Sequence, residues 1–473
     1  MKAYKKILFV FVAVLTGMIS FSSLRVKAQP SITWEKLYGY PYSDEGAYDV
    51  CESGDGNFFV VGSSGNSFSS SRIYVLKINQ FGDTLWTRKY NAGHYAYGVT
   101  ATIEYGCVLT GYGIDSLYIM KLDFKGNIVW QKFYPTTAIC FDIQRVSDGG
   151  YIACGYNLFK GYFMKVDSIG NLKWEQNYTV SNQMGFASCL EAIDGGYIAG
   201  GTVRDPDTAK TEILKVDING NTIWERRFKI LNGGATITNI LKLNKKYIIF
   251  GNSNSIYFSI LTLEGYPKFI YIFNDIGREG LLSANVIDEN KFVYTSQIFP
   301  QTGDTMYVRN WSSDSSGTIL SEKFYRTRGY MALHNILPLK NNDIIFAGIF
   351  KPVPNSNDDY SYIIRTDSSL NSKPNHVNLI NESIPEEFNL YQNYPNPFNP
   401  STNIKFDIIK AGFVEIKIYD TKGKLIQTLL NKNLNVGSYQ VKFLSYKLSS
   451  GIYFYELIFN NKIVSAKKML LLK

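Results

Sequence analysis

The sequence predicts an all-β protein in which a seven-bladed β-propeller precedes a small immunoglobulin-like β-sandwich. Three observations support this fold class. Two short motifs alternate along most of the 473-residue chain, and each returns seven times. The repeated region has no helical periodicity and consists of short apolar runs bounded by turn residues. The residues after 387 contain further alternating stretches that do not belong to the repeat.

The repeat consists of two interleaved motifs. The first is a lysine strand, a Gly-Asn or Gly-Asp turn and a strand with Trp, as in Lys77–Trp86. The second opens on an Asp-Gly turn and ends in glycine, and its copies are separated by 44 to 52 residues. Such a period is typical of propeller blades. The five clearest copies of the second motif are Asp55–Gly62, Glu104–Gly111, Asp148–Gly155, Asp194–Gly201 and Asn244–Gly251.

Each unit is expected to form four short antiparallel strands. The Asp-Gly turn suits a tight hairpin, because glycine accepts positive φ without penalty. The Gly-Asn turn suits a longer hairpin with one left-handed residue. A repeat solenoid fits less well, since each unit is already a complete meander. In the first unit the predicted strands are 47–53, 57–63, 72–79 and 84–90.

The two ends of the repeat region predict a closed ring. Residues 31–38 match the fourth strand of a unit but stand alone at the start of the region. The last unit, 331–369, has three strands and no fourth. We therefore expect 31–38 to complete the seventh blade, which closes the ring and hides its edges. The propeller is expected to occupy residues 29–369.

Charges on the Trp strands predict the strand order within a blade. Residues such as Arg88 and Lys89 would blunt an exposed edge, so the Trp strands are expected outside and the first strands at the central channel. Six residues before each copy of the second motif, six of the seven units carry a small polar residue. We interpret this set as a ring at the channel mouth, with caps at strand starts as the alternative. The seven residues are Asp49, Gly98, Asp142, Ser188, Thr238, Ser283 and Asn335.

Other repeated residues are assigned to architecture. The recurring Trp and Tyr side chains could form a sugar-stacking platform, but packing between blades explains better why they return in every unit. Asp123, Asp167 and Asp217 are expected to bond the backbone of their own turns. The same reasoning applies to the recurring lysines, Lys77, Lys121, Lys165 and Lys215.

The net charge of +9 is unevenly distributed. Residues 1–28 carry +5, residues 385–473 carry +6, and the part between them carries −2. A near-neutral main domain argues against nucleic acid as a partner. Lysines before the apolar run 7–15 predict a secretory signal peptide over 1–28. That run is too short to cross a bilayer, and no later stretch is long and apolar enough for a transmembrane span.

The cysteines are expected to be buried free thiols, and the exported chain carries an odd number of them, five. Counting across the hairpin at Asp148 places Cys154 opposite Ile143 rather than Cys140, which argues against a disulfide there. Neither the cysteines nor the three histidines have the spacing of a zinc motif. No metal and no other cofactor are expected.

The chain after the repeats is predicted to be a separate small domain. A polar stretch, 370–386, is expected to be a linker, and the domain is expected to occupy 387–473. Its punctuation by turn residues suggests an immunoglobulin-like sandwich. The predicted strands are 403–408, 412–419, 424–430, 438–444, 451–459 and 462–472.

Four stretches of this domain carry a family resemblance: Asn393–Pro400, with the sequence NYPNPFNP, Val414–Asp420, Leu448–Tyr455 and Lys467–Lys473. They closely resemble the type A C-terminal sorting domain of the type IX secretion system. The resemblance implies a cargo that is exported across the outer membrane and then released or attached to the cell surface. Its implied partners are the outer-membrane translocon and its sorting peptidase. The residues expected to carry the sorting signal are Pro395, Asn396, Pro397, Phe398, Gly451, Tyr453, Lys467 and Lys468.

Three functions remain open for the propeller. The favoured one is a secreted or cell-surface module that binds a glycan or a protein, with the loops 298–306 and 351–359 as candidate recognition segments. The second is a polysaccharide-degrading enzyme, which needs two carboxylates across one bond; Asp49 and Asp142 are the acids of the proposed ring. The third is a purely structural surface protein. The repeats resemble those of exported proteins with endoglucanase-like labels, but a scaffold does not fix an activity.

Overall fold

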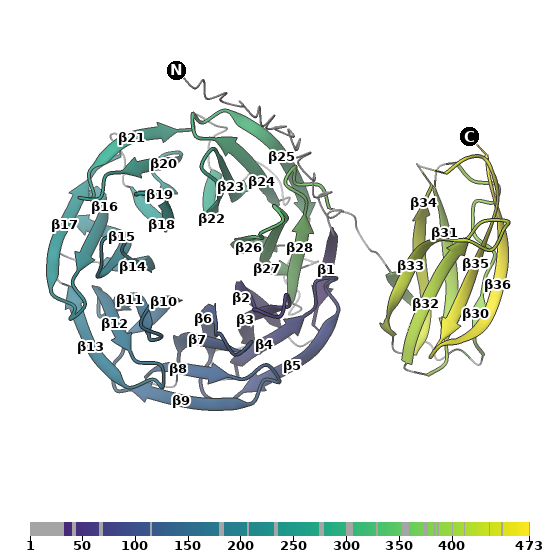
Figure 1. Cartoon of the computed structure of the whole chain (residues 1–473), viewed down its shortest axis with the longest axis horizontal. Coiled ribbons are helices and arrows are strands. Elements are labelled where there is room, and N and C mark those ends of the chain that lie inside the picture. The colour runs from purple at the N-terminus through teal and green to yellow at the C-terminus, as the bar shows by residue number, and fades with distance from the viewer. Residues whose placement is uncertain are drawn as a thin grey trace, which may run out of the picture.

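In the computed structural model of the chain, the regular elements of the described residues are β-strands, which form nine four-stranded antiparallel sheets (Figure 1). The predicted all-β fold class is thereby confirmed. The structure describes residues 33–472 with the exception of 40–43, 66–69, 114–115, 179–183, 206–207, 231–234, 274–278, 299–305, 328–329, 352–358, 373–376, 382–384, 386, 400, 411, 435 and 446–447. The predicted signal peptide and most of the two candidate recognition loops lie outside the described residues.

Seven sheets are arranged as propeller blades around a central channel (Figure 1). In the first six blades the strands follow one another from the channel outwards, so the Trp strand is outermost, as its charges predict. Blades 1 to 3 are β2–β5 (Glu45–Glu52, Phe58–Ser64, Arg72–Ile78, Thr84–Tyr90), β6–β9 (Tyr95–Ala101, Cys107–Tyr112, Leu117–Leu122, Ile128–Tyr134) and β10–β13 (Ile139–Arg145, Tyr151–Asn157, Lys160–Val166, Leu172–Tyr178). Blades 4 to 6 are β14–β17 (Met184–Glu191, Tyr197–Asp205, Thr208–Val216, Thr222–Phe228), β18–β21 (Thr236–Leu243, Lys246–Asn252, Ile256–Leu261, Pro267–Ile272) and β22–β25 (Glu279–Asp288, Lys291–Ile298, Met306–Asp314, Ile319–Thr327).

The seventh blade combines the two ends of the repeat region. Its strands, from the channel outwards, are β26 (Tyr330–Pro338), β27 (Ile344–Lys351), β28 (Tyr360–Thr366) and β1 (Trp34–Tyr38). The β1 strand pairs antiparallel to β28, with Trp34 opposite Arg365 and Tyr38 opposite Ser361. An N-terminal strand therefore supplies the outer edge of the last sheet, and its hydrogen bonds to β28 close the ring.

Neighbouring blades are joined on the outside by an aromatic side chain that covers a turn glycine. The turn glycine Gly126 has a φ of +81°, and a Cβ added to it would lie 2.9 Å from the Trp86 ring of the preceding blade. The Trp86 indole donates a hydrogen bond to the carbonyl of Phe124, and the Tyr90 hydroxyl donates one to the carbonyl of Gly126. The same packing recurs for Trp34 on Gly82, Trp130 on Gly170, Trp174 on Gly220, Trp224 on Gly265 and Tyr271 on Gly317. The repeated aromatic side chains are thus packing groups of the seam between blades.

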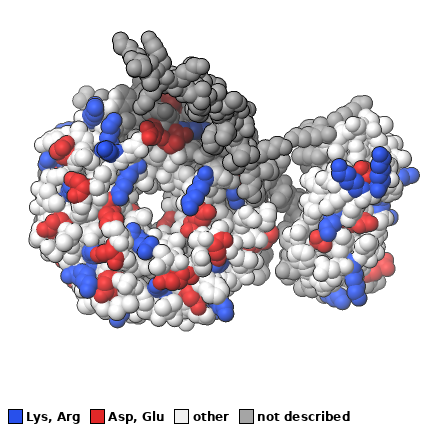
Figure 2. Space-filling model, viewed as in Figure 1, with Lys and Arg blue, Asp and Glu red and all other residues white. Residues whose placement is uncertain are grey.

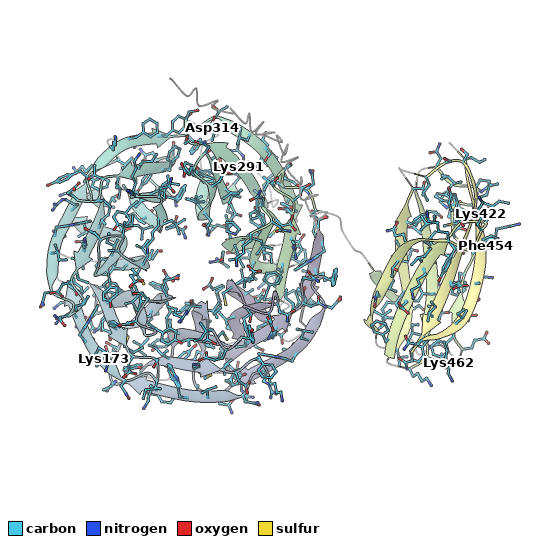
Figure 3. The ribbon with its side chains drawn as sticks, viewed as in Figure 1. Lys173, Lys291, Asp314, Lys422, Phe454 and Lys462 are labelled. Atoms are coloured by element: carbon cyan, nitrogen blue, oxygen red, sulfur yellow. The ribbon has the colours of Figure 1, made fainter. Side chains whose placement is uncertain are left out.

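The repeated acidic and basic residues stabilise single blades. One carboxylate oxygen of Asp123 accepts the N–H groups of Lys125 and Asn127, which shapes the outer turn. The same bonds occur at Asp314, labelled near the outer edge of the ring in Figure 3. The buried Lys77 pairs with Asp55 of the inner hairpin at 2.9 Å. Equivalent pairs are Lys121–Glu104, Lys165–Asp148, Lys215–Asp194 and Arg365–Asp343.

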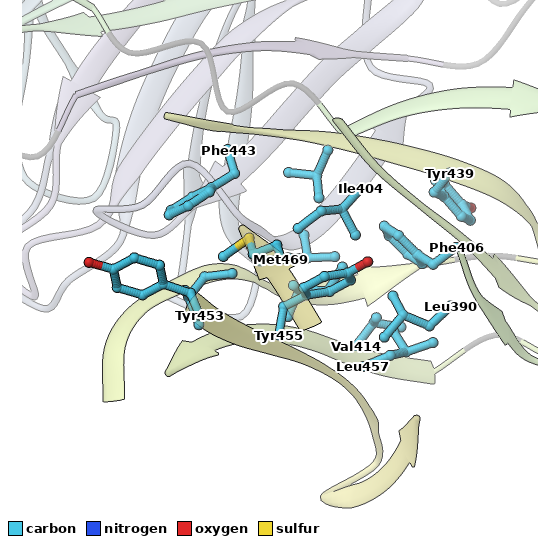
Figure 4. Close-up of a cluster of buried hydrophobic side chains, with 14 of the residues drawn as sticks. Leu390, Ile404, Phe406, Val414, Tyr439, Phe443, Tyr453, Tyr455, Leu457 and Met469 are labelled. Atoms are coloured by element: carbon cyan, nitrogen blue, oxygen red, sulfur yellow. The ribbon is translucent and has the colours of Figure 1, made fainter. Parts of the chain in front are cut away.

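The C-terminal domain is a sandwich of two antiparallel sheets. One sheet has the order β29-β34-β31-β30 and the other the order β33-β32-β35-β36. Side chains from both sheets, among them Phe406, Val414 and Tyr455, meet in one buried cluster (Figure 4). The strands are β29 (Val377–Asn381), β30 (Asn389–Leu390), β31 (Ser401–Ile408), β32 (Gly412–Tyr419), β33 (Leu425–Leu434), β34 (Gly437–Leu444), β35 (Gly451–Phe459) and β36 (Lys462–Leu471).

The segment 370–386 differs from the expected linker. It contains β29, which pairs with β34 as the edge strand of the first sheet, with Val377 opposite Val441. The surrounding Ser, Asn and Pro residues gave this segment the composition of a loop. An edge strand tolerates such flanks, because only one of its sides needs a hydrogen-bonded neighbour.

The seam between blades makes a testable prediction about turn glycines. Replacement of Gly170 by Ala forces a β-carbon to a φ of +81° and to within 2.7 Å of the Trp130 ring. Gly149→Ala is the matched control, because Gly149 has a φ of +83° with nothing within 4 Å of the added carbon. Both changes should cost about 1–2 kcal/mol for the left-handed backbone, and Gly170→Ala should cost at least about 1 kcal/mol more for the overlap. Urea unfolding measures both losses, and equal losses would contradict a packed seam.

Candidate functional site at the inner edge of the ring

The first strand of every blade contains a β-bulge at the same place. In blade 1, Ala47 pairs with Gly62 and Asp49 with Val61, so Tyr48 is left without a partner residue in the ladder. A bulge adds one residue to a strand and re-aims its side chain, and bulges are frequent next to functional sites. The seven extra residues are Tyr48, Tyr97, Phe141, Ala187, Thr238, Leu282 and His334.

In six of the seven blades a glycine beside the bulge allows a carbonyl oxygen of the first strand to approach the second strand closely. A Cβ added to Gly155 would lie 1.8 Å from the carbonyl oxygen of Ile139, so no other residue fits there. In six blades the glycine that ends the second motif has this role, with carbonyl distances between 1.7 and 2.1 Å. These glycines are Gly62, Gly111, Gly155, Gly201, Gly251 and Gly348.

The two acids of the predicted ring lie in the seams between blades. One oxygen of Asp49 accepts the backbone N–H of Val99 in the next blade at 2.7 Å, and the other accepts that of Val50. Asp142 accepts the N–H of Cys189 in its next blade at 2.9 Å. Burial raises the pKa of both carboxyl groups, that of Asp49 well above its usual range. Both carboxyl groups therefore join the inner strands of neighbouring blades through these hydrogen bonds, and we call them carboxylate latches.

Thr238 was assigned to the ring by counting, and the structure corrects this assignment. Thr238 is the bulge residue of blade 5, and Asn239 takes the place equivalent to Asp49, where it accepts the N–H of Ala284 at 3.0 Å. The count failed because the β18–β19 hairpin has a two-residue turn, with Leu243 opposite Lys246.

The remaining members of the predicted ring lie directly after the bulges of their blades. Gly98 permits a close contact, since a Cβ there would lie 3.1 Å from the Cα of Asp142. Ser188 is buried and bonds the Asp142 carboxylate, and Ser283 is buried on β22. Asn335 is half-buried on β26, opposite Ala347.

The bulge residues of four consecutive blades form a continuous aromatic arc, which we define as His334, Tyr48, Tyr97 and Phe141. The ring of Tyr48 lies 5.5 Å from that of His334 and 5.3 Å from that of Tyr97, which lies 5.6 Å from Phe141. Burial lowers the pKa of His334 to about 4, so its imidazole is neutral at physiological pH. The other three blades carry Ala187, Thr238 and Leu282 at this position, so the arc covers one sector of the inner edge only.

The arc continues into a groove of about 450 Å³ between blades 2 and 3, which we call the tyrosine groove. Tyr95 and Tyr97 lie parallel in it, with an interplanar angle of 4° and 5.6 Å between ring centres. Phe141 stacks on Tyr156, which connects the groove to the arc. The groove is lined by Tyr95, Tyr97, Tyr112, Thr137, Ile139, Tyr156, Leu158 and Phe159.

One wall of the groove is a strained hairpin tip. Leu158 and Phe159 form the two-residue turn between β11 and β12, and their φ angles are +45° and +66°. Positive φ at both positions is the geometry for which Asn-Gly is preferred, and a branched or bulky residue pays for it in backbone strain. The two side chains are 69% and 65% exposed, so burial does not compensate for this strain. Strain of this kind is concentrated at binding sites.

The charged side chains do not favour one sign of ligand. On the visible face of the ring, acidic and basic residues are interspersed (Figure 2). The side chains that line the groove itself are mainly aromatic and apolar. Sequence reasoning missed the arc because in six of the seven blades, including the four that form the arc, it selected the residue after the bulge. The Gly at the end of the second motif was the signal that could have revealed it.

The sorting motif joins the start of the C-terminal domain to its last strand. The backbone of Phe398, a buried residue, pairs with that of Leu470 and Leu472. The side chain of Asn396 accepts the N–H of Leu470 at 2.9 Å. Gln392 donates to the carbonyl of Lys468. Pro395 and Pro397 flank Asn396, and both follow cis peptide bonds.

The other predicted sorting residues lie on the two C-terminal strands. Gly451 begins β35, and Tyr453 is buried and donates its hydroxyl hydrogen to the carbonyl of Ser449. Lys467 is partly exposed and Lys468 is exposed on β36. The motif is therefore assembled only when the domain is folded.

The latch at Asp49 makes a prediction about stability and pH. Asp49→Ala leaves the buried Val99 N–H without an acceptor and should cost about 1–3 kcal/mol at any pH. Asp49→Asn keeps an oxygen acceptor and removes a carboxyl group whose pKa is raised by burial. A raised pKa favours folding below the unfolded value of about 3.9, and this advantage is lost as the pH rises.

Relative to the unchanged protein, Asp49→Asn should therefore gain stability as the pH rises above about 4. Urea unfolding at several pH values measures the trend. A relative loss of stability for Asp49→Asn with rising pH would show that the ionised carboxylate stabilises the fold.

Comparison with known proteins finds one family that matches the C-terminal residues and several solved structures of similar fold. The secretion system C-terminal sorting domain family matches residues 392–472. No curated protein matches the sequence. The streptogramin B lyase structure shares 13% identity at a TM-score of 0.45, covering 71% of this chain and 98% of that one. The WD40 β-propeller domain of Doa1 shares 13% identity at a TM-score of 0.45, covering 72% of this chain and 98% of that one. The structure of YCF48 bound to D1 peptide shares 11% identity at a TM-score of 0.43, covering 71% of this chain and 95% of that one.

At this level of similarity no ligand or activity can be transferred to the chain. No helix among the described residues is both long and apolar enough to span a membrane. The arrangement of the seven blades and the family match together define the protein. The chain is a β-propeller protein whose residues 392–472 match the secretion system C-terminal sorting domain family.

Proposed function

We propose that this exported propeller is a glycan-binding protein and that the tyrosine groove between blades 2 and 3 is its binding site. The single observation that carries the proposal is the strained, exposed Leu158-Phe159 turn beside a groove of stacked tyrosines. A turn that serves only to connect two strands would gain stability from Asn-Gly. The exposed apolar pair at this strained turn therefore supports a role in recognition.

The chemistry of the groove suits sugar rings, which have apolar C–H faces and a rim of hydroxyl groups. The parallel faces of Tyr95 and Tyr97 offer flat apolar area, while phenol groups offer hydrogen bonds. Burial raises the pKa of Tyr97, so its hydroxyl stays protonated and can donate. The volume of about 450 Å³ falls within the ordinary range for pockets that bind small ligands.

The groove is held in shape by polar contacts behind its rim. The hydroxyl of Thr137 donates to the side-chain oxygen of Asn157 at 2.7 Å, and the amide of Asn157 donates to Thr136. Asn157 pairs with Lys160 directly below the Leu158-Phe159 tip. A site held in shape in this way loses little conformational entropy on binding.

A hydrolytic function has less support than binding. A glycosidase needs two carboxyl groups that face the scissile bond. Asp49 and Asp142 instead accept backbone N–H groups of the next blade. Their raised pKa values follow from burial in these seams.

A panel of soluble and insoluble polysaccharides tests the proposal. The full chain should be retained by at least one glycan without releasing reducing ends. Tyr97→Ala should weaken that binding at least tenfold, while Phe133→Ala, an exposed aromatic residue on the outer strand β9, should leave it unchanged.

Release of reducing ends that is lost in Asp49→Asn or Asp142→Asn would make the protein a hydrolase. If the chain binds no glycan but binds a protein through Tyr97, the groove is confirmed as the binding site and the proposed ligand, a glycan, is wrong. Equal effects of Tyr97→Ala and Phe133→Ala would reject the groove as the site.

The hairpin tip makes a separate prediction in which stability and binding change in opposite directions. Replacing Leu158 by Asn and Phe159 by Gly removes two strained residues and should stabilise the fold by about 1–3 kcal/mol. The same double variant should weaken glycan binding, because two side chains that line the groove are lost. Urea unfolding and glycan affinity are measured on one preparation. A stabilised variant with full affinity would show that the tip has no part in binding.

A further inference from the structure

A cluster of three metal-ligating groups lies in the seam between blades 3 and 4. Asp142 on β10 is directly opposite Cys154 on β11, and Cys189 comes from β14 of the next blade. One carboxylate oxygen and the two sulfur atoms all lie within 4.8 Å of one another. The turn between β10 and β11 sets this pairing: Arg145 lies opposite Tyr151, so Cys154 falls opposite Asp142 and not opposite Ile143 as predicted.

The cluster contains negative charge that lacks a counter-ion. In the described part of the chain no lysine or arginine pairs with Asp142 or with Asp49, and the charge of Asp142 raises the pKa of Asp49. Buried charges in proteins are ordinarily paired or bound to a metal. The carboxylate of Asp142 accepts hydrogen bonds from the N–H groups of Cys189 and Ile143 and from the side chains of Gln144 and Ser188, which orient it, so a bound cation would take the place of one of these donors.

The donor set is one that a thiophilic divalent cation prefers. Zinc binds Cys sulfur at about 2.3 Å and carboxylate oxygen at about 2.0–2.2 Å in a tetrahedron, whose S–S edge is about 3.8 Å. The separations in the cluster are compatible with such edges after a small inward movement of the side chains. Both thiols are buried in the core cluster between the two blades, while Asp142 is partly exposed.

We propose that Asp142, Cys154 and Cys189 form a binding site for one zinc ion that joins blade 3 to blade 4. Two S–H bonds break, two Zn–S bonds and one Zn–O bond form, and both protons go to solvent. The fourth position is left for a water molecule or for the hydroxyl of Ser188, which already bonds Asp142. The cation replaces the missing positive charge of the seam, and its binding free energy adds to the stability of the folded ring.

The sequence hid this site because its ligands come from three strands of two blades. Burial raises the pKa of Cys154 to about 11 and that of Cys189 well above its usual range, so the thiols are protonated when no cation is present. A bound cation changes the protonation state of both thiols, since a coordinating thiol is deprotonated. Zinc binding should therefore weaken as the pH falls.

Cobalt substitution tests the site on the full chain, purified under reducing conditions. We expect one equivalent of Co²⁺ or Zn²⁺ to be retained, thiolate-to-cobalt charge-transfer absorption to appear, and zinc to raise the melting temperature. Cys154→Ala and Cys189→Ala should abolish the absorption, and Asp142→Asn should weaken cobalt binding at least tenfold. Cys107→Ala is the matched control, because Cys107 is an equally buried thiol in blade 2 and should leave binding unchanged.

The outcome for the unchanged chain decides the question even if a cysteine variant fails to fold. A chain that retains no cobalt and shows no charge-transfer absorption overturns the proposal. Peptide mapping of the unreduced chain that finds Cys154 and Cys189 joined in a disulfide, with no cobalt binding after reduction, also overturns it. Absorption that survives in both alanine variants would place the metal elsewhere and reject this site.

Discussion

The inner edge of this propeller depends on one close approach between two backbones. A carbonyl oxygen of the first strand lies where a Cβ of the second strand would be, so six blades carry glycine there. The bulge lies beside that close approach and leaves one residue of the first strand, such as Tyr48, without a partner in the ladder. The aromatic arc, the carboxylate latches and the thiol cluster all lie within one or two residues of it.

The outer edge is governed by a different constraint. In six of the seven seams a blade covers a turn glycine of the next blade with an aromatic ring, and in the seventh the equivalent turn position of blade 7 is Leu370, with a φ of +64°. The inner and outer seams act at opposite ends of the same blades. Together they join sheets that have no hydrogen-bonded ladder between them, and β1 extends the arrangement to the last blade. Such a ring is rigid enough to hold a shaped groove at its inner edge.

Variation among the blades, not their repetition, separates recognition from architecture. Residues that occupy the same place in most blades bond a turn, pair within a blade or cover a neighbour, as Lys77 and Trp86 do. The bulge position breaks the pattern, with aromatic rings in four blades and smaller or aliphatic groups in the other three. The hairpin tip at Leu158 breaks it again, with backbone strain that no local packing explains.

The sequence by itself determined the number of blades, the strand order within them, the partner of the N-terminal strand and the identity of the sorting domain, because these depend on period, charge and a specific motif. Tertiary structure decided which residues of the first and second strands lie opposite one another at the inner edge. A bulge shifts the register by one residue, and one residue exchanges the faces of a strand. In blade 1 the counted position was Asp49, one residue after the bulge residue Tyr48. Two other errors came from the lengths of the hairpin turns: the count selected Thr238 instead of Asn239, and Ile143 instead of Asp142 as the neighbour of Cys154. The thiol cluster was equally hidden, since contact between blades brings its groups together from separate strands.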